Sequence, residues 1–149
     1  IGPKADGTIP EDQQKILFEI GDWLEVNGDA IYNTEYWTVF GEGPTEVKKG
    51  HHSEGENKGF TAQDIRFTKK DNKLYAILLA WPENNSVTIE SLALGNTNAE
   101  GLDIKSITLL GSDNEIAYKQ TSTGLEIANL GEKKGDHAFC LEITLGDKI

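Results

Sequence analysis

The chain has 149 residues, with 25 acidic against 14 basic side chains and a formal net charge of −11 at pH 7. This length allows one domain with a substantial core but not two. The negative charge argues against nucleic acid and anionic membrane surfaces as partners. No apolar run approaches the roughly 20 residues of a membrane span, so we predict no membrane insertion.

Cys140 is the only cysteine, which excludes a disulfide within the chain. The sequence starts at Ile1 and contains no methionine. We interpret it as a piece of a longer protein; removal of a tag or leader is the alternative.

A helix is predicted near the start of the chain. The run Thr8-Ile9-Pro10-Glu11 offers a capping box or a proline at the first helical position, and Gly28 is a typical stop. The apolar residues between them form one stripe: Ile16, Leu17, Ile20, Trp23 and Leu24. This stripe needs a cover, either the chain's own β-domain or an α/β body of which the helix is the last member.

Residues 46–59 are polar and are predicted to form a surface loop after an aromatic-rich connector over residues 30–40. The loop contains His51 and His52 with two glutamates nearby, which are residue types that bind metals. Adjacent side chains in a loop seldom converge on one ion without a rigid frame. We therefore interpret them as solvated and predict neither a metal site nor a cofactor.

The stretch from Phe60 to Pro82 is predicted to be a β-hairpin around which the domain is arranged. Its first half alternates, the run Lys69–Lys73 supplies the turn, and an apolar strand follows from Leu74 to Trp81. That second strand is apolar on both faces, whereas antiparallel strands usually keep one face in water. One face is expected to pack on the domain's core. The other face needs a second cover, which comes either from the chain's own helix or loops, or from a neighbouring domain.

Further strands are predicted after the hairpin, separated by residues typical of turns. They span Ser86–Leu94, Ile104–Leu110, Ile116–Gln120, Gly124–Leu130 and Ala138–Leu145. The last of them alternates most cleanly, so its apolar residues from Phe139 to Leu145 are expected in the core. Short strands at this spacing are typical of a sandwich. We predict a mainly β fold: an antiparallel two-sheet β-sandwich preceded by one amphipathic α-helix.

No catalytic residue is assigned. A retaining glycosidase needs two carboxyl groups about 5 to 5.5 Å apart in a rigid frame, and with this many acids a pair alone means little. We interpret Glu42 and Asp64, which lie beside aromatic or strand residues, as turn residues or surface charges. The sequence has neither a G-x-S-x-G elbow nor a phosphate-binding glycine loop. The residues alone favour a non-catalytic β-domain.

Exposed aromatic rings could stack on sugars. The candidates are Tyr36, Trp37, Trp81 and Tyr118. Trp81, like Trp23, lies in a strongly apolar pattern and is better explained as sealing a core or an interdomain seam. For Trp37 both interpretations stay open.

An ordered set of segments resembles the α-L-fucosidase family of glycoside hydrolases. Ile1–Pro10 and Ile20–Tyr32 are similar to the end of that family's catalytic barrel, where a Gly-Pro turn leads to the last barrel helix. Gly41–Pro44, Phe60–Thr68 and Leu109–Ser112 are similar to its C-terminal β-domain. The resemblance covers nearly the whole chain.

The resemblance implies a parent enzyme that removes L-fucose from fucosylated glycans with retention, its aspartate nucleophile and acid/base lying upstream of this chain. Residues 1–34 would be the final barrel loop, helix and exit segment, and residues 35–149 the C-terminal β-sandwich. The residues expected at the junction with the barrel are Gly2, Pro3, Ile20, Trp23, Leu24, Tyr32 and Trp81. Because family members are commonly exported, the resemblance also implies a periplasmic or secreted protein.

The predicted function is the C-terminal region of a retaining exo-α-L-fucosidase, non-catalytic by itself, that stabilises and walls the catalytic barrel of the same chain. The alternative is an autonomous carbohydrate-binding β-sandwich module with Tyr36 and Trp37 as its platform. A third hypothesis, a purely structural or interaction sandwich, predicts exposed apolar area around the helix.

Overall fold

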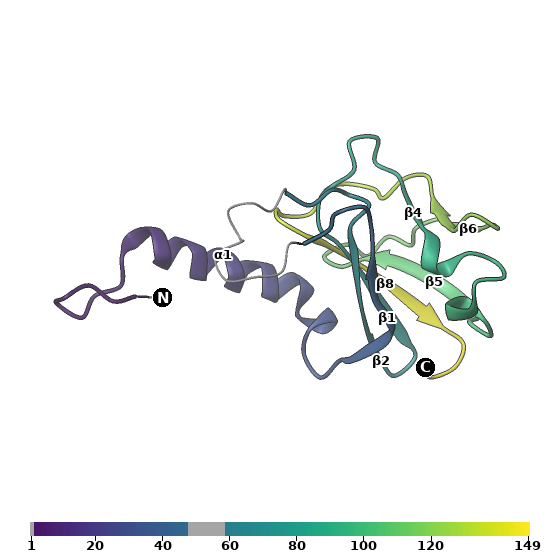
Figure 1. The fold of residues 1–149 in the computed structure, drawn as a ribbon, viewed down its shortest axis with the longest axis horizontal. Coiled ribbons are helices and arrows are strands. Elements are labelled where there is room, and N and C mark those ends of the chain that lie inside the picture. Colours follow the sequence, from purple (N-terminus) through teal and green to yellow (C-terminus); the bar gives the residue numbers. More distant parts are fainter. Residues whose placement is uncertain (1, 48–58) are drawn as a thin grey trace.

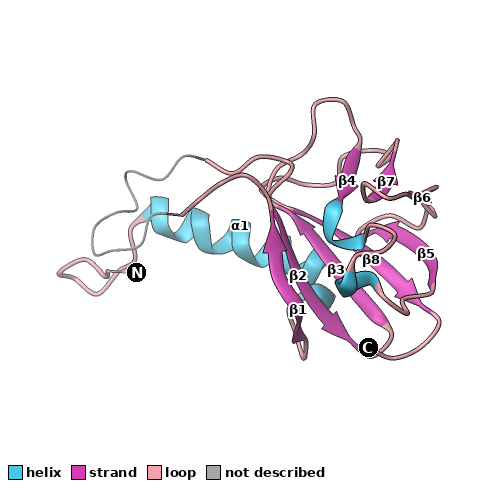
Figure 2. Ribbon diagram, turned by 45° about the vertical axis from the view of Figure 1, so that its right-hand side comes forward, coloured by secondary structure: helices cyan, strands magenta, loops and turns pink. Residues whose placement is uncertain are grey.

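The computed structural model describes residues 2–47 and 59–149, and in these residues two antiparallel sheets face each other across a core (Figure 1, Figure 2). The larger sheet has the strand order β1-β2-β3-β8-β5 and the smaller one β4-β7-β6. The strands are β1 Glu35–Glu42, β2 Ile65–Lys70, β3 Lys73–Leu78, β4 Val87–Ile89, β5 Ile104–Leu109, β6 Lys119–Gln120, β7 Leu125–Ile127 and β8 Phe139–Leu145. Helix α1, Glu11–Asn27, continues into the 3-10 turn η1, Gly28–Ala30. The predicted fold class is confirmed.

Strands β2 and β3 form the predicted hairpin, but its turn is shorter than expected. Lys70 pairs with Lys73, so only Asp71 and Asn72 connect the strands. Asp71 adopts a φ of 54°, which aspartate and asparagine tolerate better than most residues. The Asn72 amide donates to the carbonyl of Leu145 at 2.9 Å, which ties the turn to the end of β8.

The core takes alternate residues from both sheets. From the larger sheet it receives Leu74, Ala76 and Leu78 of β3 and the four apolar residues of β8 predicted to lie there. The smaller sheet contributes Val87, Ile89, Leu125 and Ile127. One face of the doubly apolar strand β3 is therefore covered by the opposite sheet.

The other face of β3 is covered by the end of the chain's own helix. A second buried cluster on this side consists of Ala30, Tyr75, Ile77 and Cys140. Trp23 of α1 packs against it, and its indole N–H donates to the carbonyl of Ala138 at 2.8 Å. Of the two covers that the sequence leaves open, the chain's own helix is the one that lies over β3.

Residues 35–40, predicted to be a connector, instead form most of the edge strand β1. Trp37 is 5% exposed, and its ring packs edge-on against Phe67 with 5.1 Å between ring centroids. Tyr36, on the opposite face of the strand, is 86% exposed. The structure thus makes Trp37 a core residue rather than half of a sugar-stacking platform.

The strand predicted over residues 86–94 stops early, because the 3-10 turn η3, Glu90–Leu92, follows β4 directly. The carboxylate of Glu42 accepts the backbone N–H groups of Glu90 and Ser91 at 2.8 and 2.7 Å. A carboxylate at the start of a turn satisfies N–H groups that have no partner within it. Glu42 is thus a capping residue rather than a free surface charge. The strands predicted over residues 116–120 and 124–130 shorten to β6 and β7.

Trp37 and Tyr36 provide a matched pair for testing the orientation of β1. We expect Trp37→Ala to lower the free energy of unfolding by about 3–5 kcal/mol, the usual cost of truncating a buried aromatic residue. Tyr36→Ala should change it by less than about 0.5 kcal/mol, because its side chain lies in solvent. Urea unfolding of the 149-residue chain followed by circular dichroism measures both. Similar losses for the two variants would contradict this orientation.

Candidate functional site

Most of helix α1 carries an apolar surface that the sheets do not cover. Its exposed apolar residues are Ile16, Leu17, Phe18, Ile20 and Val26. Phe18 is 70% exposed and Ile20 50%. Phe18 and Val26 lie off the predicted stripe, so the exposed apolar surface is wider than the stripe alone. Figure 1 shows α1 extending away from both sheets.

The helix nevertheless has no membrane-spanning character. Among residues 2–47 and 59–149, no helix combines the length and the hydropathy that a bilayer crossing requires.

An apolar cleft of about 300 Å³ lies between α1 and the segment that enters β8. Ile16, Ile20 and Trp23 line its helix side, and His137 and Ala138 line the other. The hydrogen bond from Trp23 to Ala138 joins the two walls, so the cleft has a fixed shape. Two residues predicted at the barrel junction, Ile20 and Trp23, meet here.

The other predicted junction residues lie elsewhere. Gly2, Pro3 and Tyr32 are exposed, whereas Leu24 and Trp81 are half-buried. The ring of Trp81 packs edge-on against Phe139, with centroids 4.8 Å apart, beside the core between the sheets. The structure therefore places Trp81 on the core side of the larger sheet, opposite to the face that α1 covers.

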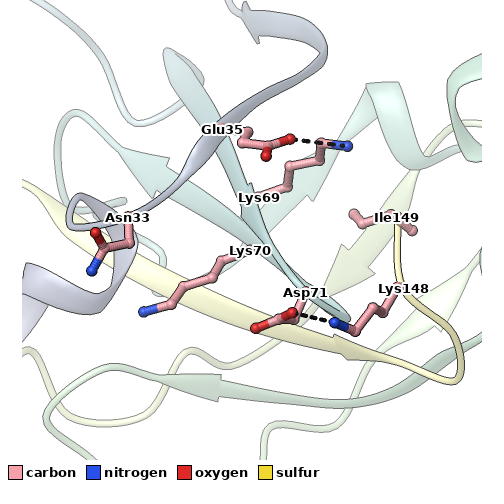
Figure 3. Close-up of a pocket in the computed structure, with 7 residues that line it drawn as sticks. All are labelled: Asn33, Glu35, Lys69, Lys70, Asp71, Lys148 and Ile149. Atoms are coloured by element: carbon pink, nitrogen blue, oxygen red, sulfur yellow. Dashed lines mark hydrogen bonds and ion pairs between the residues drawn. The ribbon is translucent and has the colours of Figure 1, made fainter.

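A second cleft, of about 380 Å³, lies beside the hairpin turn (Figure 3). Its charged side chains are paired: Lys69 lies 3.9 Å from Glu35, and Lys148 lies 2.6 Å from Asp71. Lys70 points away from both pairs (Figure 3). These are exposed ion pairs, which contribute little to stability. The lining offers salt bridges rather than a nucleophile held by a base.

Asp64, interpreted from the sequence as a turn residue or surface charge, is fully buried. Its carboxylate accepts hydrogen bonds from the backbone N–H and the hydroxyl of Thr45, at 3.0 and 2.8 Å. Thr61 donates through the same two groups, at 2.7 and 2.8 Å. Burial opposes ionisation, but these four bonds outweigh it and lower the pKa of Asp64 to about 2.

Asp64 joins two segments that are distant in sequence. Thr45 and Thr61 lie on either side of residues 48–58, which fall outside the described residues together with the predicted histidine pair, His51 and His52. Gly43 makes the close approach possible: a Cβ there would lie 2.5 Å from the Cα of Asp64, and its φ is +128°. Thr61, three residues before Asp64, supplies two of the four bonds, but the other two depend on a contact with Thr45, 19 residues away, which no local sequence signal indicates.

Cys140 is free and buried beneath the end of α1. Burial raises the pKa of its thiol, so the sulfur stays protonated and is unsuited to act as a nucleophile. The carboxylates and the thiol described above thus serve packing and capping.

Taken together, the fold and its surfaces define an accessory β-sandwich domain that carries one helix and covers it only at one end. Residues 57–144 match the family model described as "Alpha-L-fucosidase C-terminal domain", and residues 1–29 match the model described as "Alpha-L-fucosidase". The chain belongs to the α-L-fucosidase family, of which it represents the C-terminal domain.

Curated relatives and solved structures agree with this assignment. The tissue α-L-fucosidase of Rattus norvegicus is 31% identical over 120 residues, which cover 80% of this chain and 21% of that protein. The plasma α-L-fucosidase of Homo sapiens is 33% identical over 135 residues, covering 87% of this chain and 24% of that protein. The crystal structure of Thermotoga maritima α-fucosidase superimposes with a TM-score of 0.69 at 28% identity, covering 97% of this chain and 29% of that one. The chain spans about a fifth of the curated relatives it matches.

The lowered pKa of Asp64 predicts that the domain loses stability at acid pH. Its folded pKa of about 2 lies below the ordinary value of 3.8, so its stabilisation is complete above about pH 5 and is lost as the pH falls through 3.8 towards 2. The shift corresponds to about 2 kcal/mol. Asp64→Asn should therefore lower the free energy of unfolding at pH 7 by this order, and the difference from the natural chain should shrink towards pH 2.

Urea unfolding between pH 2 and pH 7 measures the effect. Asp113→Asn is the matched control, because it removes an exposed carboxylate and should leave the profile unchanged. A difference between Asp64→Asn and the natural chain that does not vary with pH would contradict the role of the ionised carboxylate.

Proposed function

We propose that this chain is the C-terminal region of a retaining exo-α-L-fucosidase and is non-catalytic by itself. Residues 1–34 form the last loop, helix and exit segment of the catalytic barrel, and residues 35–149 form the β-sandwich that stabilises and walls it. The parent enzyme hydrolyses terminal L-fucose from fucosylated glycans, with both catalytic carboxyl groups in the barrel. The parent enzyme is located in the periplasm or the extracellular space.

The observation that carries the proposal is the uncovered apolar surface of α1. Burying one large aliphatic or aromatic side chain stabilises a protein by about 1.5–3 kcal/mol, so leaving Ile16, Phe18 and Ile20 in water forgoes several such contributions. The segment that matches the model "Alpha-L-fucosidase", residues 1–29, contains the whole of this helix. A barrel packed along α1 accounts for both facts.

The substrate class rests on the relatives. The Thermotoga maritima enzyme has been crystallised with fucose and with a mechanism-based inhibitor. Two carboxylates of this chain, Asp64 and Glu42, support a catalytic pair located elsewhere, because both are held by backbone N–H donors. A general acid needs a raised pKa, whereas that of Asp64 is lowered.

The carbohydrate-binding alternative has less support. Of its two platform residues, Trp37 is buried and only Tyr36 offers an exposed ring.

Activity on an aryl α-L-fucoside tests the proposal directly. We expect a longer protein that carries the preceding barrel to release the aryl group with retention at the anomeric carbon, and the 149-residue chain to give no turnover above buffer. Aryl release is followed by absorbance and the anomer formed first by NMR. Turnover by the 149-residue chain, or none by a well-folded longer protein, would refute the proposal.

The helix surface gives a second test. Ile20→Lys should lower the melting temperature of the longer protein by several degrees, because it places a charge in an apolar interface. The same change in the 149-residue chain should have little effect, because Ile20 is exposed there. Glu25→Lys is the matched control, since it introduces the same side chain at an exposed position off the stripe. Scanning calorimetry of all four variants makes the comparison, and equal effects of Ile20→Lys in both proteins would count against barrel packing along α1.

A further inference from the structure

We infer that the outer face of β1 and β2 carries a second docking surface for the same catalytic barrel. We call it the Arg66 patch and define it by Tyr36, Phe40, Phe60 and Arg66. The inference rests on the proposed function, because its occupant is the barrel that precedes this chain. It adds that the barrel touches the sheet as well as the helix, and that it presents an apolar surface with a carboxylate to Arg66.

The guanidinium of Arg66 is held in place between two aromatic rings. Its central carbon lies 5.5 Å from the ring centroid of Phe40 and 5.5 Å from that of Phe60. One terminal nitrogen also donates to the carbonyls of Ile65 and Glu42, at 2.9 and 3.3 Å. The group is therefore oriented before any partner arrives, which reduces the entropy lost on binding.

The aromatic rings of the patch remain open to solvent. Tyr36 is 86% exposed, Phe40 75% and Phe60 44%. Single exposed apolar residues are ordinary, but two exposed phenylalanine rings over one arginine, with Tyr36 exposed on the same sheet opposite Thr68, have the composition of an interface hot spot. This grouping favours a protein surface as the occupant.

Charge indicates the chemistry of that surface. The chain as a whole carries a net charge of −11, yet within residues 2–47 and 59–149 Arg66 forms no salt bridge. Its guanidinium hydrogen-bonds only to carbonyls there. A partner that brings a carboxylate to Arg66 gains a charge-assisted hydrogen bond that residues 2–47 and 59–149 do not supply.

The Arg66 patch lies near the end of α1 that packs on the sheet. Thr68 lies two residues from Arg66 on the same face of β2, and its hydroxyl donates to the carbonyl of Ala30 in η1 at 2.7 Å. Two residues along a strand span about 7 Å. A body lying along α1 and across the sheet therefore reaches both surfaces. The matched part of the rat enzyme is 21% of its length, so such a body exists in the relatives.

Hydroxyl-radical footprinting with mass spectrometry tests the inference by comparing the 149-residue chain with the longer protein that carries the barrel. We expect the oxidation rates of Tyr36, Phe40 and Phe60 to fall several-fold in the longer protein. Phe18 and Ile20 report on the helix contact, and Leu94, an exposed residue next to η3, is the control that should not change.

The outcomes separate the two proposals. Protection of Phe18 and Ile20 without protection of Tyr36 and Phe40 would overturn the Arg66 patch and leave the proposed function intact, whereas no protection at either surface would remove both. Protection of the patch in the 149-residue chain at high concentration, or on addition of a fucosylated oligosaccharide, would overturn the barrel as occupant in favour of a second copy or a glycan.

Arg66→Met in the longer protein tests the role of the charge. It keeps an apolar stem of similar length, so we expect faster oxidation of Tyr36 and Phe40 with the sandwich still folded, as verified by circular dichroism of the 149-residue chain. Arg66→Lys provides a milder change if the methionine variant unfolds. Lys133→Met is the matched control, because it removes a cation 5.4 Å from the ring of Phe139, away from the patch. Unchanged oxidation in a folded Arg66 variant would refute the role of the guanidinium.

Discussion

Strand β3 is buried on both faces, and the arrangement of the rest of the chain depends on this. Leu74 and Leu78 face the opposite sheet, while Tyr75 and Ile77 face the end of α1. Each such side chain contributes about 1.5–3 kcal/mol when buried, and a whole domain is stable by only about 5–15 kcal/mol. Neither face of β3 can therefore remain exposed to water. The smaller sheet and the helix end are therefore both necessary parts of the domain.

Covering β3 uses only one end of α1. Its contacts there come from Trp23 and the 3-10 turn that ends at Ala30, while Asn27 is buried and donates to the carbonyl of Trp23 at 3.1 Å. The helix has 17 residues and is thus about 25 Å long, so most of its length lies beyond these contacts. The same element closes this domain at one end and offers an apolar surface at the other. The uncovered part of the helix thus carries an apolar pattern that a single sandwich does not need.

The sequence predicts best where one physical cause determines each element. The alternation in β8 and the two apolar faces of β3 reflect burial alone, and both predictions are confirmed. Strand β1 escapes detection because Trp37 faces the core while Tyr36 and Phe40, on the opposite face, are also aromatic. The alternation of buried and exposed residues in β1 is therefore not visible as an alternation of apolar and polar residues in its sequence. The role of Asp64 is not predicted for another reason: its partner Thr45 is distant in sequence and comes close only after folding.

Glu42 and Asp64 show why these acids support structure rather than bond cleavage. Glu42, the last residue of β1, pairs with Ile65, the first residue of β2, so the carboxylates of Glu42 and Asp64 lie at the same end of this strand pair. They accept hydrogen bonds from different donors. The donors around Asp64 favour its charged form, whereas the carboxylate of Glu42 caps the N–H groups at the start of η3. A glycosidase acid needs the opposite environment, one that keeps a proton available near neutral pH. Because the pKa of Asp64 is held at about 2, its carboxylate acts as a permanent negative anchor. This carboxylate is therefore unsuited to chemistry that requires a mobile proton near neutral pH.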